Sequence, residues 1–155
     1  MALEIGDRAP EFSLASSTGQ EISLAGLQGK KVVLYFYPKD DTPGCTTEAC
    51  GFRDINTDIA DAGAVVLGVS ADGLESHDRF IRKFELNFPL LADEDKTVAN
   101  AYGAWGEKEV NGKTVIGMIR KTFLIDEAGG IQKTWPLVTP AGHAEEVLAA
   151  IKGGE

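Results

Sequence analysis

The fold is decided by residues 31–70, which read KVVLYFYPKDDTPGCTTEACGFRDINTDIADAGAVVLGVS. The stretch begins with an apolar run over 31–37 and ends with another over 64–70, and both runs are rich in β-branched, aliphatic or aromatic residues. Continuous runs of this kind predict strands that are buried on both faces. The residues between them predict an amphipathic helix over 42–62, because apolar side chains recur three and four positions apart, at Phe52, Ile55 and Ile59. The order strand, helix, strand predicts a parallel crossover.

The flanking sequence extends this unit at both ends. Apolar and polar residues alternate over 12–15 and 21–24, on either side of a turn, which predicts a small N-terminal hairpin. Further strands are predicted over 118–125 and 131–135, which pair across a turn cluster, and further helices over 74–86, 97–102 and 142–151. Together these elements predict a single α/β domain over 1–155, with three layers, a mixed central sheet and thioredoxin-like topology.

Composition narrows the class of function. The 155 residues are 43% hydrophobic and 25% charged, which is typical of a globular domain. Asp and Glu outnumber Lys and Arg by 24 to 15, which gives a net charge of -9 and a pI near 4.7. This balance disfavours nucleic acid and anionic membrane surfaces as partners. The sequence shows neither a signal peptide nor an apolar run near the roughly 20 residues that span a bilayer, so we expect a cytoplasmic protein.

Cys45 occupies a position that favours a reactive thiol. It follows the first buried strand, at the carboxyl end where open α/β sheets bind ligands. Thr42 and Pro43 form a good N-cap and first helical residue, which places Cys45 in the first turn of the predicted helix. Unpaired backbone N–H groups and the positive end of the helix dipole favour the thiolate there.

The role of the second cysteine has two interpretations. Cys50 lies near the apolar stripe of the helix, so it is either a buried, inert residue or a partner of Cys45. The pair is not a Cys-x-x-Cys redox motif. We expect no metal site and no cofactor, because His77 and His143 stand at no zinc-finger spacing and are most simply solvated helix residues.

The chain resembles a known family along nearly its whole length. Pro38-x-x-x-Thr42-x-x-Cys45 is similar to the active-site signature of peroxiredoxins, which are thiol peroxidases on a thioredoxin-like fold. The remaining sequence resembles their bacterioferritin-comigratory, or Q-type, subgroup. The matching strings are GDRAPEF at 6–12, TPGCT at 42–46, ACGFRD at 49–54, VSAD at 69–72, LLAD at 90–93, WGEK at 105–108 and RKTFLID at 120–126.

The resemblance implies a role for each matching residue. It implies that Cys45 is the peroxidatic cysteine and Cys50 the resolving cysteine. It further implies that Thr42 and Arg120 bind the peroxide. Without the resemblance, we would interpret Arg120 as a solvated arginine at the start of a strand. Glu48 stands where the family carries an acid or amide that fixes the arginine by a paired hydrogen bond. Pro38 would shield the thiolate from water.

The same resemblance implies the partners. These are a peroxide substrate and thioredoxin or a similar dithiol reductant, and the protein would be a monomer or a weak dimer. Two other classes of function stay open on the residues alone. One is a thiol-disulfide oxidoreductase, although the separation of the cysteines by five rather than three positions disfavours rapid exchange. The other is a redox-sensing module, in which oxidation of Cys45 changes a surface that another protein binds.

Overall fold

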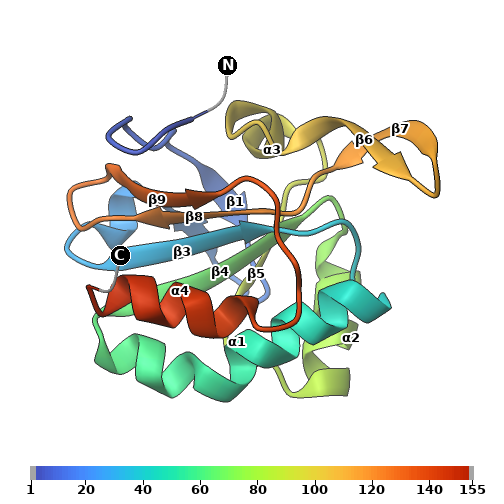
Figure 1. The fold of residues 1–155 in the computed structure, drawn as a ribbon. Helices are drawn as coiled ribbons and strands as arrows, with labels where there is room; N and C mark the ends of the chain where they lie inside the picture. The colour runs from blue at the N-terminus through green and yellow to red at the C-terminus, as the bar shows by residue number, and fades with distance from the viewer. Residues whose placement is uncertain (1–2, 154–155) are drawn as a thin grey trace.

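The computed structural model describes residues 3–153, and within them a five-stranded mixed sheet forms the centre (Figure 1). The strand order is β5-β4-β3-β8-β9. The strands are β3 (Lys31–Phe36), β4 (Ala64–Ser70), β5 (Leu90–Ala92), β8 (Lys121–Ile125) and β9 (Ile131–Trp135). β3, β4 and β5 run parallel, whereas β8 and β9 add antiparallel strands beside β3. The predicted mixed sheet and its parallel crossover are confirmed.

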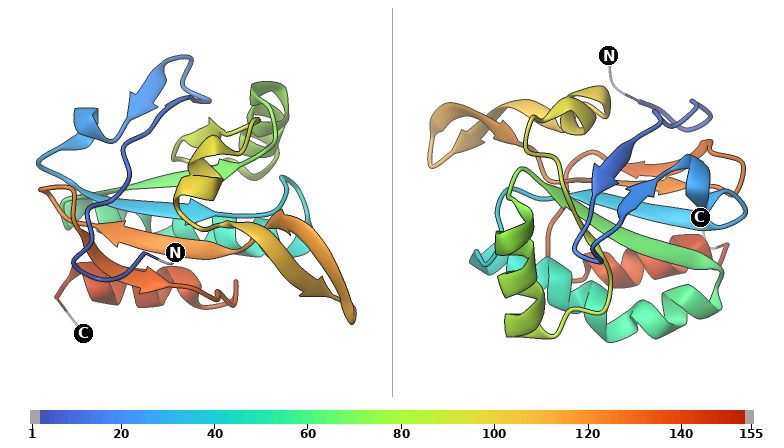
Figure 2. Two further views of the ribbon diagram at one scale, coloured as in Figure 1. Left: turned by 90° about the horizontal axis from the view of Figure 1, so that it is seen from above. Right: turned by 180° about the vertical axis from the view of Figure 1, so that it is seen from behind.

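Different elements cover the two faces of this sheet (Figures 1 and 2). One face carries the long helices α1 (Pro43–Asp61), α2 (Leu74–Phe84) and α4 (His143–Ile151). The other carries the hairpin of β1 (Ser13–Ala15) and β2 (Glu21–Ser23), the 3-10 helix η1 (Ala25–Leu27) and the short helix α3 (Thr97–Ala101). The result is the predicted three-layer arrangement. No described helix is long and apolar enough to cross a membrane.

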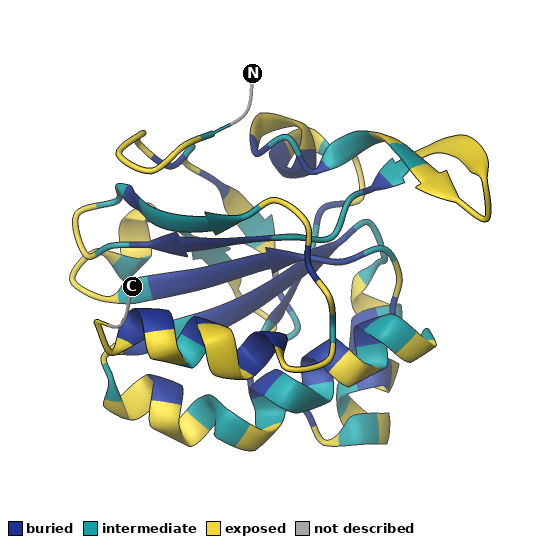
Figure 3. Cartoon of the chain, in the orientation of Figure 1, coloured by how far each residue is buried: buried dark blue, intermediate teal, exposed yellow. Residues whose placement is uncertain are grey.

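Strand β3 is the centre of the core (Figure 3). Its side chains alternate between the faces, with Val33 and Tyr35 among the residues under the helices and Leu34 and Phe36 among those under the N-terminal hairpin and α3. All four are fully buried. Burying a large apolar side chain contributes roughly 1.5–3 kcal/mol, so this strand holds both outer layers to the sheet. Its continuous apolar sequence is therefore the pattern of a strand that is buried on both sides.

A protruding hairpin corrects one prediction. Strands β6 (Trp105–Val110) and β7 (Lys113–Met118) pair antiparallel and extend away from the sheet (Figure 2). The predicted strand over 118–125 is therefore wrong at its start, because Met118 ends the hairpin and β8 begins only at Lys121. The turn at Asn111 and Gly112 has φ of 54° and 80°, the left-handed values of a tight hairpin turn. That Asn-Gly pair is the sequence signal that could have predicted the hairpin.

Candidate active site

The first turn of α1 holds Cys45 as the sequence predicts. Thr42 is the N-cap residue, with extended backbone angles, and Pro43 is the first helical residue. Cys45 is only 1% exposed. Thr46 is the first residue whose N–H bonds back within the turn, to the Thr42 carbonyl at 2.8 Å, and within residues 3–153 the N–H groups of Gly44 and Cys45 have no partner. Two backbone donors are thus free beside the sulfur.

Arg120 reaches this sulfur through the pairing of two distant strands. Lys121 of β8 pairs with Phe36 at the end of β3, so the preceding residue, Arg120, lies at the carboxyl end of β3, where α1 begins. Its Nη2 donates to Cys45 Sγ at 3.4 Å, and its Nη1 donates to Glu48 Oε1 at 2.8 Å. The side chain of Arg120 is only 18% exposed, so the interpretation of Arg120 as a solvated arginine is wrong.

Glu48 lies one turn after Cys45 on the same helix and is fully buried. Its Oε1 accepts from Arg120, whereas Oε2 has no hydrogen-bond partner among the described residues. Burial raises the pKa of Glu48 to about 7, and the nearby Arg120 charge and hydrogen bond offset only part of that effect. Burial alone would lower the pKa of Arg120, but the charges and hydrogen bonds of Cys45 and Glu48 outweigh it and raise that pKa.

Thr42 and Gly44 complete the approach to the sulfur. The Thr42 hydroxyl does not cap the helix but donates to the Lys39 carbonyl at 2.9 Å. Its oxygen therefore keeps lone pairs for an outside O–H donor. A Cβ at Gly44 would lie 3.1 Å from Arg120 Nη2, so glycine is the residue that lets the guanidinium come this close.

The structure adds a second cation that sequence reasoning missed. Lys108 of β6 folds back along its hairpin, and its Nζ donates to the Met118 carbonyl at 2.6 Å. Burial lowers the pKa of Lys108, the positive charge of Arg120 lowers it further, and the negative charge of Cys45 opposes both. The ammonium group therefore lies within the electrostatic reach of the site. Recognising the Asn-Gly turn would have predicted the hairpin but not that its lysine folds back onto the Met118 carbonyl.

The remaining sequence-predicted residues lie around this centre. Pro38 is half-buried at the start of the loop between β3 and α1. Cys50 is partly exposed on α1, and both cysteines are free thiols on one uninterrupted helix. Beside Cys50, Gly51 packs against Ala144 of α4, where an added Cβ would lie 3.4 Å from the alanine Cβ. The structure therefore places Cys45 with Arg120 and Glu48, but it does not bring Cys50 to Cys45.

Both histidines are buried, so the expectation that they are solvated is wrong. His143 is 1% exposed, and its Nε2 and Nδ1 lie 2.8 Å from Thr122 Oγ1 and from Glu146 Oε1. Burial lowers the pKa of His143, and Glu146 opposes that shift. His77 is 0% exposed and contacts Asp40. Helical periodicity did not reveal this, because both side chains are buried through polar partners from other elements. The described residues contain no group of three metal-binding side chains.

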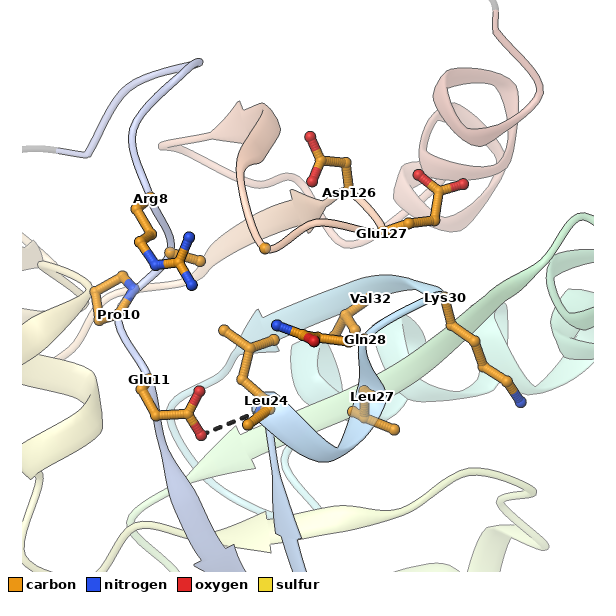
Figure 4. Close-up of a pocket in the computed structure, with 13 residues that line it drawn as sticks. Arg8, Pro10, Glu11, Leu24, Leu27, Gln28, Lys30, Val32, Asp126 and Glu127 are labelled. Atoms are coloured by element: carbon orange, nitrogen blue, oxygen red, sulfur yellow. Dashed lines mark hydrogen bonds between the residues drawn. The ribbon is translucent and has the colours of Figure 1, made fainter.

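A cavity of about 260 Å³ lies at the other end of the sheet (Figure 4). Val32, at the start of β3, forms part of its lining, whereas Cys45 follows the end of that strand. The side chains of Arg8 and Gln28 point toward the same space, and Glu11 accepts a hydrogen bond from the Ala25 N–H at 3.1 Å. This cavity has no part in the chemistry of Cys45.

Comparisons with known proteins agree with this arrangement. A family model described as the AhpC/TSA family matches residues 5–134. A putative peroxiredoxin Bcp of Coxiella burnetii is 50% identical over 151 residues, which cover 97% of this chain and 100% of the relative. Peroxiredoxin Bcp of Bacillus subtilis is 45% identical over 152 residues, which cover 98% and 97%. The solved bacterioferritin comigratory protein of Xanthomonas campestris, described in terms of its alkyl peroxide reduction activity, is 41% identical with a TM-score of 0.88 and coverage of 97% and 96%.

Replacement of Glu48 by glutamine should remove a pH dependence of stability. The pKa of Glu48 is raised from 4.5 to about 7 by burial, so the folded protein holds a proton that the unfolded chain has lost in this range. The free energy of unfolding should therefore fall as pH rises from 4.5 to 7, by about 3 kcal/mol in total. Denaturant unfolding at several pH values measures this fall. Glu48→Gln should flatten the profile, whereas Glu75→Gln, at an exposed site, should not; parallel profiles for the protein and Glu48→Gln would contradict the assignment.

Proposed function

Because this chain belongs to the AhpC/TSA family, as a peroxiredoxin of the bacterioferritin comigratory type, we propose that it reduces hydrogen peroxide and organic hydroperoxides through Cys45, with Cys50 resolving the product as an intramolecular disulfide. Members of this family are thiol peroxidases that act with a peroxide and a thiol reductant. The contact of Arg120 with the Cys45 sulfur is the observation that carries the proposal. The alkyl peroxide reduction of the Xanthomonas campestris relative supports organic hydroperoxides as substrates.

The first step is a displacement at oxygen. The Cys45 thiolate attacks one peroxide oxygen, the S–O bond forms as the O–O bond breaks, and the second oxygen leaves as hydroxide or alkoxide. The sulfur loses two electrons to the peroxide, and the leaving oxygen takes up a proton to become water or an alcohol. During this step negative charge moves from the sulfur onto the leaving oxygen. Arg120 supplies fixed positive charge beside the sulfur that stabilises it. The Thr42 hydroxyl and the free N–H groups of Gly44 and Cys45 orient the peroxide.

The second step requires α1 to unwind. Both cysteines lie within Pro43–Asp61, and five helical residues advance roughly 7.5 Å and turn about 500°. A disulfide needs Cα atoms within about 7 Å and converging side chains, so the intact helix prevents it. Once the first turns open, the Cys50 thiolate attacks the sulfenic sulfur of Cys45, the S–S bond forms, and the hydroxyl leaves as water. A thioredoxin-type dithiol then reduces the disulfide by two exchange steps.

The same geometry disfavours the alternative of a thiol-disulfide oxidoreductase. A rapid exchanger keeps its two thiols adjacent, whereas here Cys45 is buried and Cys50 is partly exposed on the same helix. Each exchange cycle would require unwinding before any protein disulfide could be attacked. A peroxide is far smaller than a protein disulfide, so its access to the sulfur requires much less opening than thiol-disulfide exchange does.

The roles of the two cysteines predict different outcomes for their serine variants. The reduced protein should consume one equivalent of peroxide without added thiol and lose the mass of two hydrogen atoms. Cys45→Ser should not react, because a hydroxyl remains protonated. Cys50→Ser should react once and gain the mass of one oxygen, as sulfenic acid, or more after further oxidation. Stopped-flow kinetics followed by intact mass measures both, and a Cys45→Ser variant that still consumes peroxide at the full rate would defeat the assignment.

Arg120→Lys should slow the first step on the order of 100-fold, as loss of a transition-state donor does. Lysine keeps the charge but loses the planar fork that holds Cys45 and Glu48 together. The rate of Cys45 oxidation in the Cys50→Ser background measures this effect without interference from resolution. Arg79→Lys, on the exposed face of α2, is the matched control and should react normally. Equal rates for Arg120→Lys and the control would exclude Arg120 from the reaction.

Disulfide formation should remove protection against amide hydrogen exchange from the first turns of α1 only. Gly44, Thr46, Thr47 and Gly51 weaken this part of the helix. Phe52 ends the weak part, because it is fully buried and its ring stacks on Tyr35 at 4.9 Å. Amide hydrogen exchange of reduced and oxidised protein should show faster exchange over 44–51, with unchanged protection over 53–61 and in β3. Equal protection over 44–51 in a verified Cys45–Cys50 disulfide would rule out unwinding.

A further inference from the structure

One peptide group of the loop before α1 is held from both sides. The carbonyl of Lys39 accepts a hydrogen bond from the Thr42 hydroxyl at 2.9 Å. The N–H of Asp40, which belongs to the same peptide unit, donates to Asp72 Oδ2 at 2.8 Å. Because a peptide group is planar, the hydrogen bond that orients its N–H also fixes the direction of its carbonyl. The Asp72 carboxylate is thereby linked to the Thr42 hydroxyl through one rigid unit.

Asp72 is itself held at the end of a buried strand. The Ser70 hydroxyl donates to Asp72 Oδ2 at 2.8 Å and accepts from the Asp72 N–H at 3.1 Å. Ser70 is fully buried and ends β4, whose neighbouring residue Val69 pairs with Phe36 of β3. The carboxylate therefore has a fixed position relative to the strand that leads into the loop. It is a partly buried acid that the peroxide chemistry does not otherwise use.

The side chain of Asp40 fixes the same peptide group from the interior. Its Oδ1 accepts from the Tyr37 hydroxyl at 2.5 Å, and its Oδ2 lies 2.8 Å from Ser76 Oγ and 2.7 Å from His77 Nδ1. His77 Nε2 lies 2.9 Å from the Leu91 carbonyl, which can only accept, so this nitrogen carries a hydrogen. Asp40 and His77 are 6% and 0% exposed. The loop is thus tied to α2 and β5 by a buried polar cluster.

The backbone of the loop needs such restraint. Asp41, between the clamped peptide and Thr42, has φ of 60°, the left-handed region that few residues other than glycine adopt. A residue in this region persists when its surroundings hold it there, and such residues gather at active sites. Hydrogen bonds on both sides of the Lys39–Asp40 peptide supply that restraint immediately before the strained residue.

We propose that Asp72, supported by the Asp40–His77 pair, is a positioning residue for peroxide reduction, because it orients the Lys39–Asp40 peptide group and through it the Thr42 hydroxyl. The hydroxyl hydrogen is directed to Lys39, so the Thr42 oxygen presents its lone pairs to the O–H of the incoming peroxide. The inference rests on the proposed role of Thr42 in binding peroxide. It adds that an acid in the loop after β4 orients the Thr42 hydroxyl.

A double-mutant cycle between Asp72 and Thr42 tests this link. Rates of Cys45 oxidation by hydrogen peroxide are measured in the Cys50→Ser background for Thr42→Val, for Asp72→Ala and for both together. Asp72→Ala should slow the reaction roughly 10-fold or more, since a misplacement of about 1 Å costs on the order of 100-fold. In the Thr42→Val background the same change should have almost no further effect, because the hydroxyl it orients is absent.

Conservative variants separate positioning from a structural role. Asp72→Asn keeps an oxygen that can accept from the Asp40 N–H, so it should restore most of the rate that Asp72→Ala loses. The thiolate absorbance of Cys45 at neutral pH should be unchanged in both variants, because the Arg120 contact is untouched. Asp58→Ala, which removes an exposed carboxylate from α1, is the charge control and should react normally. If Asp72→Ala does not fold, Ser70→Ala replaces it in the cycle, with a smaller loss of rate that again depends on Thr42.

The outcomes distinguish this inference from the proposed function. A loss of rate that is equally large with Thr42 and with Thr42→Val would overturn the positioning role while leaving peroxide reduction intact. A Thr42→Val variant that reacts at the full rate would remove Thr42 from the proposed mechanism, and the role of Asp72 with it. A Cys50→Ser protein that does not react with peroxide at all would instead refute the proposed function.

Discussion

The hydrogen bond from Arg120 to the Cys45 sulfur is the interaction on which the rest of the site depends. A thiolate removed from water is stable only if fixed donors or positive charge replace the solvent. Cys45 is 1% exposed, and one guanidinium donates hydrogen bonds both to its sulfur and to the buried Glu48. With the Glu48 pKa raised to about 7 by burial, protonation of that acid near neutral pH leaves more of the Arg120 charge to the sulfur. A side chain at Gly44 would crowd the guanidinium, because its Cβ would lie 3.1 Å from Arg120 Nη2.

The two sides of Cys45 differ in how firmly they are held. On the side of the loop, the Lys39–Asp40 peptide is fixed by Asp72 and by a buried cluster that includes His77. On the side of the helix, residues of low helix propensity extend to Gly51, and the first fully buried aromatic anchor is Phe52. The Thr42 hydroxyl on the loop side can therefore stay in place while the segment that carries Cys45 and Cys50 opens. A site that must be rigid for one step and mobile for the next uses different parts of the chain for each.

Both ends of the sheet carry polar groups, but in different environments. The carboxyl end of β3 and β4 gathers buried polar side chains, several of which hydrogen-bond to one another, such as Asp40 with His77. The opposite end opens into the cavity near Arg8, where the charged side chains are exposed. Electrostatic interactions are stronger away from water, so the buried polar end of the sheet, and not the exposed cavity, is suited to chemistry on a peroxide.

Patterns among neighbouring residues were enough to predict several elements of this fold and the position of Cys45. Apolar runs and helical spacing predicted β3, α1 and β4 within a residue or so, and the Thr42-Pro43 pair placed Cys45 in the first turn, because these features depend on neighbours along the chain. The family resemblance, not periodicity, pointed to Arg120. The matching strings include Lys108 and Asp72 but assign neither a role, and nothing in the sequence indicated the buried state of His77. Their positions follow from the register between β3 and β8, from the fold of the β6–β7 hairpin and from the packing of α2. Such contacts join residues far apart in the chain, so only the tertiary structure decides which charged groups meet at Cys45.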